Sequence, residues 1–201
     1  MSKRPGFILG LTGSIAMGKT TVSNMFRDLK VPVWCADTEV KKLYSKEGSA
    51  TKIIKKYYPE VVIRSGVDKT KLKYLIHKDN EVLGKIESIV HPLLKSSKDM
   101  FLECNKRKNV IIFDIPLLFE KNQQNSFDGV VVVTASAKTQ KDRVLRRTNM
   151  TEKDFEFIKQ HQIKEEEKIK RADFIINTDK SLSDTREDVK NLLYKIKIME
   201  S

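Results

Sequence analysis

The segment from Gly13 to Thr20 constrains the fold of this chain more than any other stretch. It reads GSIAMGKT and fits the pattern G-x-x-x-x-G-K-[ST]. The apolar run Phe7–Leu9 precedes it, and apolar residues at helical spacing follow it from Val22 to Leu29. A buried strand, a tight turn and a helix are the context in which this pattern forms a phosphate-binding loop. The sequence therefore predicts a P-loop that binds a nucleoside triphosphate.

Each fixed position of the loop has a chemical role. Gly13 and Gly18 let the backbone turn so that successive N–H groups point at one anion, and the helix that follows adds unpaired N–H donors. Lys19 supplies a positive charge for the β- and γ-phosphates, and the hydroxyl of Thr20 is a suitable ligand for Mg²⁺. The residues expected to contact the nucleotide here are Gly13, Ser14, Ile15, Ala16, Met17, Gly18, Lys19, Thr20 and Thr21.

Length and composition limit the class of protein. The 201 residues suffice for one α/β domain with an insertion. No segment approaches the roughly 20 apolar residues of a membrane span, and the apolar run after Pro5 is too short for a signal peptide. Cys35 and Cys104 provide neither a disulfide framework nor a metal-binding spacing. We therefore expect a soluble, cytoplasmic protein with no membrane partner.

The net charge of +12 raises the question of a nucleic-acid partner. However, lysine outnumbers arginine 30 to 9, and the lysines are scattered along helical stretches. Arginine clusters with interleaved aromatic residues, which base-stacking modules use, are missing. We expect no nucleic-acid partner, and the scattered lysines would instead favour a small, multiply charged anionic substrate.

Two short apolar runs end at a carboxylate. Asp37 closes the run that begins at Val31, and Asp114 follows Val110–Phe113. Ligands of open α/β sheets bind at the carboxyl ends of the strands, so Asp37 is the candidate that orients and deprotonates an attacking hydroxyl. Asp114 has the Walker B form and is the candidate Mg²⁺ ligand, directly or through water. Asp37 is equally suited to be the N-cap of a helix over residues 38–44, and the two roles do not exclude each other.

Between these carboxylates, residues 45–104 are polar and rich in helical patterns. Apolar spacing predicts helices over 49–58, 68–77, 80–89 and 93–104. Pro92 is expected in the first turn of the last helix. Strand patterns are nearly absent, which indicates a helical insertion. A kinase of small molecules would place its acceptor-binding lobe in such an insertion.

Two residues near these segments are candidate substrate contacts. His91 stands near a predicted helix start, where a lone histidine more often caps or packs than takes part in chemistry. Leu117 follows Pro116, which ends the strand before it, and Leu117–Phe119 more often pack than bind. We keep His91 and Leu117 as candidate contacts to the acceptor.

Residues 138–170 have the features of a lid. A helical pattern over 139–147 places Arg143, Arg146 and Arg147 within one turn. Thr151 is then expected to cap a helix that continues to Lys170, with a capping box to Asp154. A polar helical hairpin with arginines can close over phosphates. The alternative is an exposed, salt-bridged hairpin.

The remaining strands complete an α/β sheet. Apolar runs at 130–133 and 174–176 follow those at 7–9, 31–35 and 110–113, with helical segments between them. This alternation predicts five parallel strands with right-handed crossovers. Asn177 is expected at the same edge of the sheet as Gly13, and an amphipathic helix over 183–199 closes the chain.

Five sequence blocks, taken together, resemble the dephospho-CoA kinase family. The blocks are L-T-G-x-I-x-x-G-K-[ST]-T at Leu11–Thr21, A-D at Ala36–Asp37, H-P at His91–Pro92, D-I-P-L-L-F-E at Asp114–Glu120, and Ala172–Asn177. They occur in order over nearly the whole chain. The block D-I-P-L-L-F-E is far more discriminating than the phosphate loop.

The resemblance implies a fold, a reaction and site residues. The fold would be a three-layer P-loop core in the sheet order 2-3-1-4-5, and the reaction would be transfer of phosphate from ATP, with Mg²⁺, to the 3′-hydroxyl of dephospho-CoA. By similarity Asp37 would be the base, Arg143 and Arg147 would belong to the lid, and Asn177 would lie near the adenine. The implied parts are a core of 1–44, 105–137 and 171–201, an acceptor-binding domain of 45–104, and a lid of 138–170.

Three residues depart from the pattern associated with the family. Ser14 and Ala16 stand where glycines are usual, and Cys35 replaces an aspartate that is common before A-D. The outer glycines, Lys19 and Thr20 are unchanged, so we expect phosphate binding to persist.

Other functions remain open at this point. A kinase of another small acceptor, such as a nucleoside monophosphate, would differ only in its acceptor lobe. A GTP switch or a nucleic-acid-stimulated NTPase is less favoured, because no guanine-reading N-K-x-D follows a candidate strand. A monomer or a weak homo-oligomer is expected.

Overall fold

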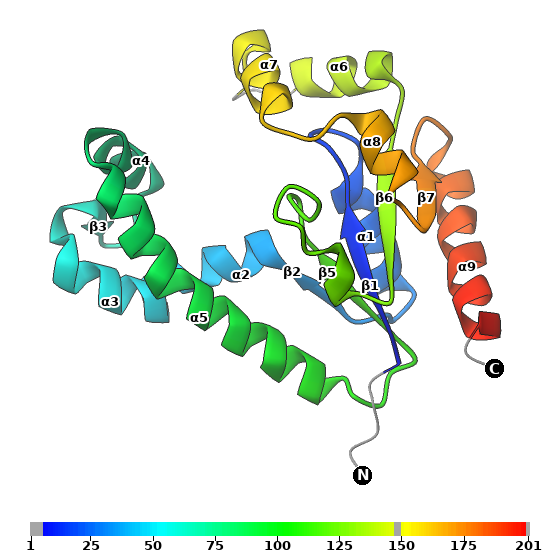
Figure 1. Ribbon diagram of the computed structural model, residues 1–201, viewed down its shortest axis with the longest axis horizontal. Coiled ribbons are helices and arrows are strands. Elements are labelled where there is room, and N and C mark those ends of the chain that lie inside the picture. Colours follow the sequence, from blue (N-terminus) through cyan, green and yellow to red (C-terminus); the bar gives the residue numbers. More distant parts are fainter. Residues whose placement is uncertain (1–5, 147–149, 200–201) are drawn as a thin grey trace. The chain divides into compact units, whose positions relative to one another are not determined.

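The computed structural model describes residues 6–146 and 150–199, and its core is one parallel five-stranded sheet (Figure 1). The strand order is β2-β5-β1-β6-β7. The strands are β1 (Phe7–Thr12), β2 (Val33–Cys35), β5 (Val110–Asp114), β6 (Gly129–Thr134) and β7 (Phe174–Asn177). Counting these five strands along the chain gives 2-3-1-4-5, so the predicted fold class and strand order are confirmed.

The register of the strands brings their carboxyl ends to one edge of the sheet. Leu11 of β1 lies beside Asp114 of β5 and beside Val131 of β6, while Asn177 at the end of β7 pairs with Thr134 of β6. The phosphate loop leaves β1 at this same edge. Side chains that are far apart in the sequence are therefore gathered around the loop.

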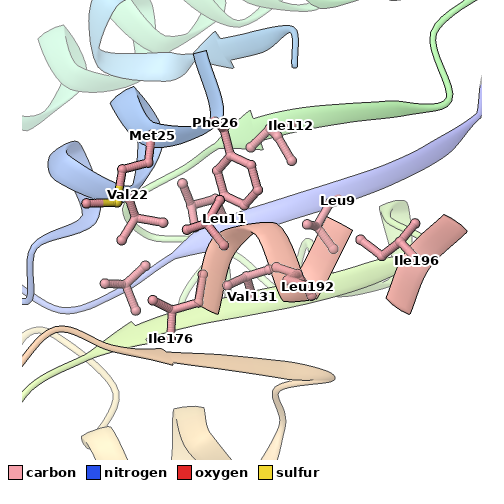
Figure 2. Close-up of a cluster of buried hydrophobic side chains, with 12 residues drawn as sticks. Leu9, Leu11, Val22, Met25, Phe26, Ile112, Val131, Ile176, Leu192 and Ile196 are labelled. Carbon is pink, nitrogen blue, oxygen red and sulfur yellow. The ribbon is translucent and has the colours of Figure 1, made fainter. Parts of the chain in front are cut away.

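Helices α1 and α9 cover one face of the sheet. Phe26 of α1 is fully buried, as is Ile196 of α9, and Figure 2 shows them in one apolar cluster with Leu9, Leu11 and Val131 of the strands. On such a face, burial of each large apolar side chain contributes about 2 kcal/mol. The helices that pack with the sheet or follow its strands are α1 (Lys19–Asp28), α6 (Ala137–Leu145), α7 (Glu152–Gln160), α8 (Glu165–Lys170) and α9 (Leu182–Met199), and the 3₁₀ helix η2 spans Gln124–Ser126.

A second apolar cluster forms around the segment after β5. Leu118 and Phe119 are fully buried and pack with Val130 of β6. Ile163 and Ile169 pack against this cluster, so the chain around α8 is fixed to the sheet through apolar contacts.

The region predicted as one helix from Thr151 to Lys170 is two helices, α7 and α8. The predicted capping box is confirmed, because Thr151 accepts from the N–H of Asp154 while the carboxylate of Asp154 accepts from the N–H of Thr151. The expected continuity is wrong, since α7 ends at Gln160 and α8 begins at Glu165. In the break, the N–H of Ile163 donates to Glu120 at 3.0 Å instead of to a helical carbonyl.

The chain divides into two compact units, residues 1–34 with 105–201 and residues 35–104. The second unit has its own core, which includes Ile54, Leu72 and Ile86. Its elements are α2 (Ala36–Leu43), α3 (Ser49–Tyr57), η1 (Pro59–Val61), β3 (Val62–Ile63), β4 (Gly66–Val67), α4 (Lys69–Lys78) and α5 (Asn80–Cys104). Helix α2 packs in this unit against α3 and α5. The division into a nucleotide core, an acceptor domain and a lid stays a prediction.

The hairpin β3–β4 was not expected from the sequence. Each of its strands has two residues, which is too short for an alternating pattern to be visible. Gly66 adopts a φ of 125°, and a Cβ there would lie 2.1 Å from the carbonyl oxygen of Tyr44. Only glycine fits this close approach of two backbones.

Helix α5 is continuous, although two helices were predicted. Pro92 lies inside the helix and not in a first turn. Its ring removes one backbone N–H donor and clashes with the preceding turn. The residues of α5 that are buried, Val82, Ile86, Ile89 and Val90, all precede the proline. Packing of this N-terminal half keeps the helix in place despite the proline.

Replacement of Pro92 with alanine is therefore expected to stabilise the protein by about 1 to 2 kcal/mol. Alanine restores a helical hydrogen bond, and the greater freedom of the unfolded chain offsets part of that gain. The free energy of unfolding in urea would measure the change. Lys95→Ala, at an exposed position one turn later, is the control and should change stability by less than about 0.5 kcal/mol. Destabilisation by Pro92→Ala would show that the helix requires its proline.

Candidate active site

The phosphate loop joins β1 to α1 through a tightly turned backbone. The N–H of Met17 donates to the carbonyl of Ser14 at 3.2 Å, Ala16 has a φ of 61° and Gly18 a φ of 91°. Gly18 is the N-cap of α1, so the first N–H groups of this helix open toward the loop. The loop geometry is that of an anion-binding turn at a helix N-terminus.

Glycine is required at position 18. Besides its positive φ, a Cβ at this position would lie 2.9 Å from the hydroxyl of Thr178. The loop is therefore packed against the segment that follows β7.

Lys19 and Asp114 form an ion pair next to the loop. Asp114 ends β5 and is only 3% exposed, while Thr20 is exposed in the first turn of α1. The structure thus brings together the lysine of the P-loop and the carboxylate of the Walker B strand.

The oxygen donors at this edge fit a magnesium ion. Thr20 supplies a hydroxyl and Asp114 a carboxylate, which are ligands that Mg²⁺ prefers. In residues 6–146 and 150–199, no three His, Cys, Asp or Glu side chains gather as a self-sufficient metal site. Mg²⁺ usually keeps waters and takes phosphate oxygens beside one or two protein ligands, so two protein oxygens are chemically sufficient.

Arg143 of α6 reaches the outer side of the phosphate loop. Its Nη1 donates to Oγ1 of Thr178 at 2.8 Å and its Nη2 to the carbonyl of Thr178 at 2.7 Å, and Nη1 lies 3.4 Å from the carbonyl of Ala16. Of the predicted lid arginines, Arg143 is therefore held against the loop, whereas Arg147 lies outside the described residues.

Thr178 is a site residue that the sequence did not reveal. It is buried, and its hydroxyl donates to the carbonyl of Met17 at 2.8 Å while it accepts from Arg143. A threonine one residue beyond a predicted strand carries no distinctive signal. Its position next to Asn177, at the edge shared with the loop, was the only available indication.

Asn177 ends β7 with its side chain exposed, and its Oδ1 accepts from the N–H of Asp179 at 2.7 Å. The carboxylate of Asp179 in turn accepts from the N–H and the hydroxyl of Ser136, the N-cap of α6. The hydrogen bond with Thr139, above all, lowers the pKa of Asp179 below its ordinary value. These bonds fix α6, which carries Arg143, beside the end of β7.

The sequence also missed two glutamines that hold the loop backbone. Nε2 of Gln140 donates to the carbonyl of Ile15 at 2.8 Å, and Oε1 of Gln162 accepts from the N–H of Ile15 at 3.1 Å. Both the backbone N–H and the backbone C=O of Ile15 are therefore satisfied by side chains from the region predicted to be a lid.

Two predicted acceptor residues, Asp37 and His91, belong to the unit of residues 35–104. Asp37 is exposed in the first turn of α2, and Cys35 is the N-cap of that helix. The alternative role of Asp37 as an N-cap is therefore wrong. Its exposed carboxylate does not cap α2. His91 is exposed within α5, so it neither caps a helix nor packs in a core.

Leu117 lies in the turn after β5 and is 40% exposed, while the next two residues, Leu118 and Phe119, are fully buried. Leu118 and Phe119 pack, as expected, and Leu117 is the member of the run that a ligand can reach.

Comparison with known proteins identifies the family of this chain. A family model described as dephospho-CoA kinase matches residues 7–184. The chain belongs to the dephospho-CoA kinase family. Curated relatives named dephospho-CoA kinase include one from Bartonella henselae, 42% identical over 184 residues that cover 90% of this chain and 94% of the relative. Another, from Ruegeria pomeroyi, is 40% identical over 95% of this chain and 96% of the relative.

Solved structures show the same fold as this member of the dephospho-CoA kinase family. The crystal structure of TT1252 from Thermus thermophilus is similar with a TM-score of 0.81 and 29% identity, over 96% of this chain and 98% of that chain. A dephospho-CoA kinase from Campylobacter jejuni is similar with a TM-score of 0.66 and 21% identity, over 95% and 97% of the two chains. Among the described residues, no helix has the length and apolar character needed to cross a membrane.

Proposed function

We propose that this protein transfers the γ-phosphoryl group of ATP to the 3′-hydroxyl of dephospho-CoA, which yields coenzyme A and ADP. The observation that carries the proposal is the pairing of Lys19 with Asp114 beside a P-loop, in a chain that belongs to the dephospho-CoA kinase family. Phosphoryl transfer needs positioning and stabilisation of charge more than covalent participation by the protein, and this arrangement supplies both.

The loop and its neighbours would hold the nucleotide. The N–H groups between Gly13 and Thr21 are proposed to bind the phosphates, and Lys19 to leave Asp114 in part and contact the β- and γ-oxygens. Mg²⁺, held by Thr20 and Asp114, would neutralise phosphate charge when bound. Arg143 is proposed to add positive charge at the outer side of the loop. Asn177 and Arg147 are proposed as further nucleotide contacts, near the adenine and in the lid respectively.

The acceptor would be bound by the unit that contains α2 to α5. We propose that Asp37 orients the 3′-hydroxyl and accepts its proton, and that His91 and Leu117 contact dephospho-CoA. The exposed positions of all three side chains support this role. We also propose residues 138–170 as a lid over the nucleotide.

The setting of the reaction is part of the proposal. From its sequence composition, the enzyme is proposed to act in the cytoplasm as a monomer or a weak homo-oligomer, without a nucleic-acid partner. The scattered lysine excess agrees with a small anionic substrate.

The test is to incubate the protein with Mg-ATP and dephospho-CoA and to identify the products by mass. Coenzyme A and ADP in equal amounts are expected. A panel of nucleoside monophosphates, shikimate and gluconate tests the alternative of another small acceptor. Transfer to one of these, with dephospho-CoA unchanged, would contradict the proposed acceptor. Hydrolysis of ATP that RNA or DNA stimulates would contradict the assignment to small-molecule kinases.

A further inference from the structure

Helix α8 carries a lysine whose charge is completely enclosed. The side chain of Lys168 is 0% exposed, and its ammonium group lies 2.8 Å from Oε1 of Glu120. A buried charge costs several kcal/mol unless paired, and a well-packed apolar residue would often be equally stable there. Stability alone therefore does not explain a lysine at this position.

The second partner of Lys168 lies in the phosphate loop. Its Nζ donates to Oγ of Ser14 at 3.1 Å, and the same hydroxyl donates to Oε2 of Glu165 at 2.7 Å. Ser14 is itself buried. Two charged groups from α8 thus fix the side chain of the residue that follows Gly13.

Glu120 connects this cluster to the strand that carries Asp114. It closes the block that begins at Asp114, and its Oε1 also accepts from the N–H of Ile163 at 3.0 Å. Within the described residues, Oε2 of Glu120 and Oε1 of Glu165 are buried without a hydrogen-bond partner. Lys168 pairs directly with Glu120 and reaches Glu165 through the hydroxyl of Ser14, so its ammonium group links the two carboxylates.

The strained backbone of the phosphate loop is held by hydrogen bonds from residues outside the loop. Ala16 holds a φ of 61°, a conformation that residues with a Cβ adopt at a cost and keep only where the surroundings enforce it. The residue before it, Ile15, donates its backbone N–H to Gln162 and accepts at its backbone C=O from Gln140. Lys168, through Ser14, adds a charged link on the Gly13 side of the loop.

We propose that Lys168 is a positioning residue of the phosphate loop, which acts through Ser14 and Glu120 and keeps the loop in its nucleotide-binding conformation. It also anchors α8 to the loop. The inference rests on the proposed function in one respect, that the nucleotide bound is ATP.

The test is the affinity for Mg-ATP, measured by calorimetry without any acceptor. Lys168→Met is expected to weaken Mg-ATP binding by about tenfold, the order of one hydrogen bond to a charged group. Its KM for dephospho-CoA should stay within about twofold, because loss of loop order affects the nucleotide site. Lys170→Met is the matched control, since Lys170 is exposed on the same helix, and should bind as the unaltered protein does.

A double-mutant cycle separates positioning from general packing. If Lys168 acts through Ser14, then Lys168→Met should cost much less ATP affinity in a Ser14→Ala background than alone. Additive losses, an unchanged ATP affinity, or equal losses for ATP and dephospho-CoA would each overturn the proposal. If Lys168→Met does not fold, the variants Ser14→Ala and Glu165→Gln provide the test. Each is expected to lower the affinity for Mg-ATP several-fold. Normal Mg-ATP affinity in both variants would overturn the proposal.

This result does not depend on the identity of the acceptor. If the unaltered protein binds Mg-ATP but phosphorylates a different acceptor, the proposed function fails while the comparison of ATP affinities still decides the role of Lys168. If ATP does not bind to the unaltered protein at all, both proposals fail.

Discussion

Replacement of Lys19 with alanine is expected to lower kcat/KM by about a thousandfold, or about 4 kcal/mol of transition-state stabilisation. Lys19 is the first residue of α1, and its ammonium group pairs with Asp114 beside the phosphate loop; the proposed function has it contact the β- and γ-phosphates from there. Charge that develops on the transferred phosphoryl group would lose its nearest mobile cation. Single-turnover kinetics with saturating Mg-ATP and dephospho-CoA would measure the loss.

This variant also leaves Asp114 without its ion-pair partner. The carboxylate of Asp114 is 4% exposed, so its orphaned charge is expected to lower the free energy of unfolding by about 1 to 3 kcal/mol. The double variant Lys19→Ala/Asp114→Asn removes that charge and should regain stability without regaining turnover. Recovery of turnover in the double variant, or near-normal turnover in Lys19→Ala, would contradict the assigned role of Lys19.

The sheet could be predicted because its information is local. Runs such as Val110–Phe113 are apolar on both faces and end at a polar residue, which is typical of a buried parallel strand. The phosphate loop is equally local, since all of its fixed residues lie between Gly13 and Thr20. Strand order followed from resemblance, whereas the ion pair between Lys19 and Asp114 was not predicted, since the sequence assigned these groups to the phosphates and to Mg²⁺.

The contacts around the loop could not be predicted because they join distant parts of the chain. Lys168 stands in a polar stretch where a lysine normally faces solvent, and only the fold brings it to Ser14, 154 residues earlier. The same holds for Thr178, whose hydroxyl donates to the carbonyl of Met17, a residue 161 positions earlier in the sequence. No local spacing encodes such pairs, because the sheet order decides which segments become neighbours.

The misplaced helix boundaries have a different cause. Pro92 was expected to begin a helix, since the first turn tolerates proline, yet packing of the preceding residues carried α5 through it. Conversely, the helix predicted to continue beyond Gln160 is interrupted there. Gln162 and Ile163 form hydrogen bonds with Ile15 and Glu120 instead of hydrogen bonds within a helix. Tertiary contacts overrode local preference in both places.

Replacement of Asp37 with asparagine is expected to lower turnover by about a hundredfold or more while Mg-ATP affinity stays within about twofold. Asparagine keeps the size of the side chain and one hydrogen-bond acceptor but cannot take a proton, and loss of a general base typically costs 10² to 10⁴ in rate. Because Asp37 is exposed and does not cap α2, the fold should tolerate the change. Turnover and ATP affinity, measured separately, give the two readouts.

The size of the loss distinguishes two roles of this carboxylate. In a loose transition state the proton leaves late, so a group that only orients the hydroxyl could serve as well as a base. An orienting role is retained in part by asparagine and would give a loss of less than about tenfold. Glu47→Gln, which removes an exposed carboxylate from the turn after α2, is the control and should leave turnover within about threefold. A collapse of ATP affinity in Asp37→Asn would instead assign Asp37 a structural role, because an acceptor-side base has no reason to affect binding of the first substrate alone.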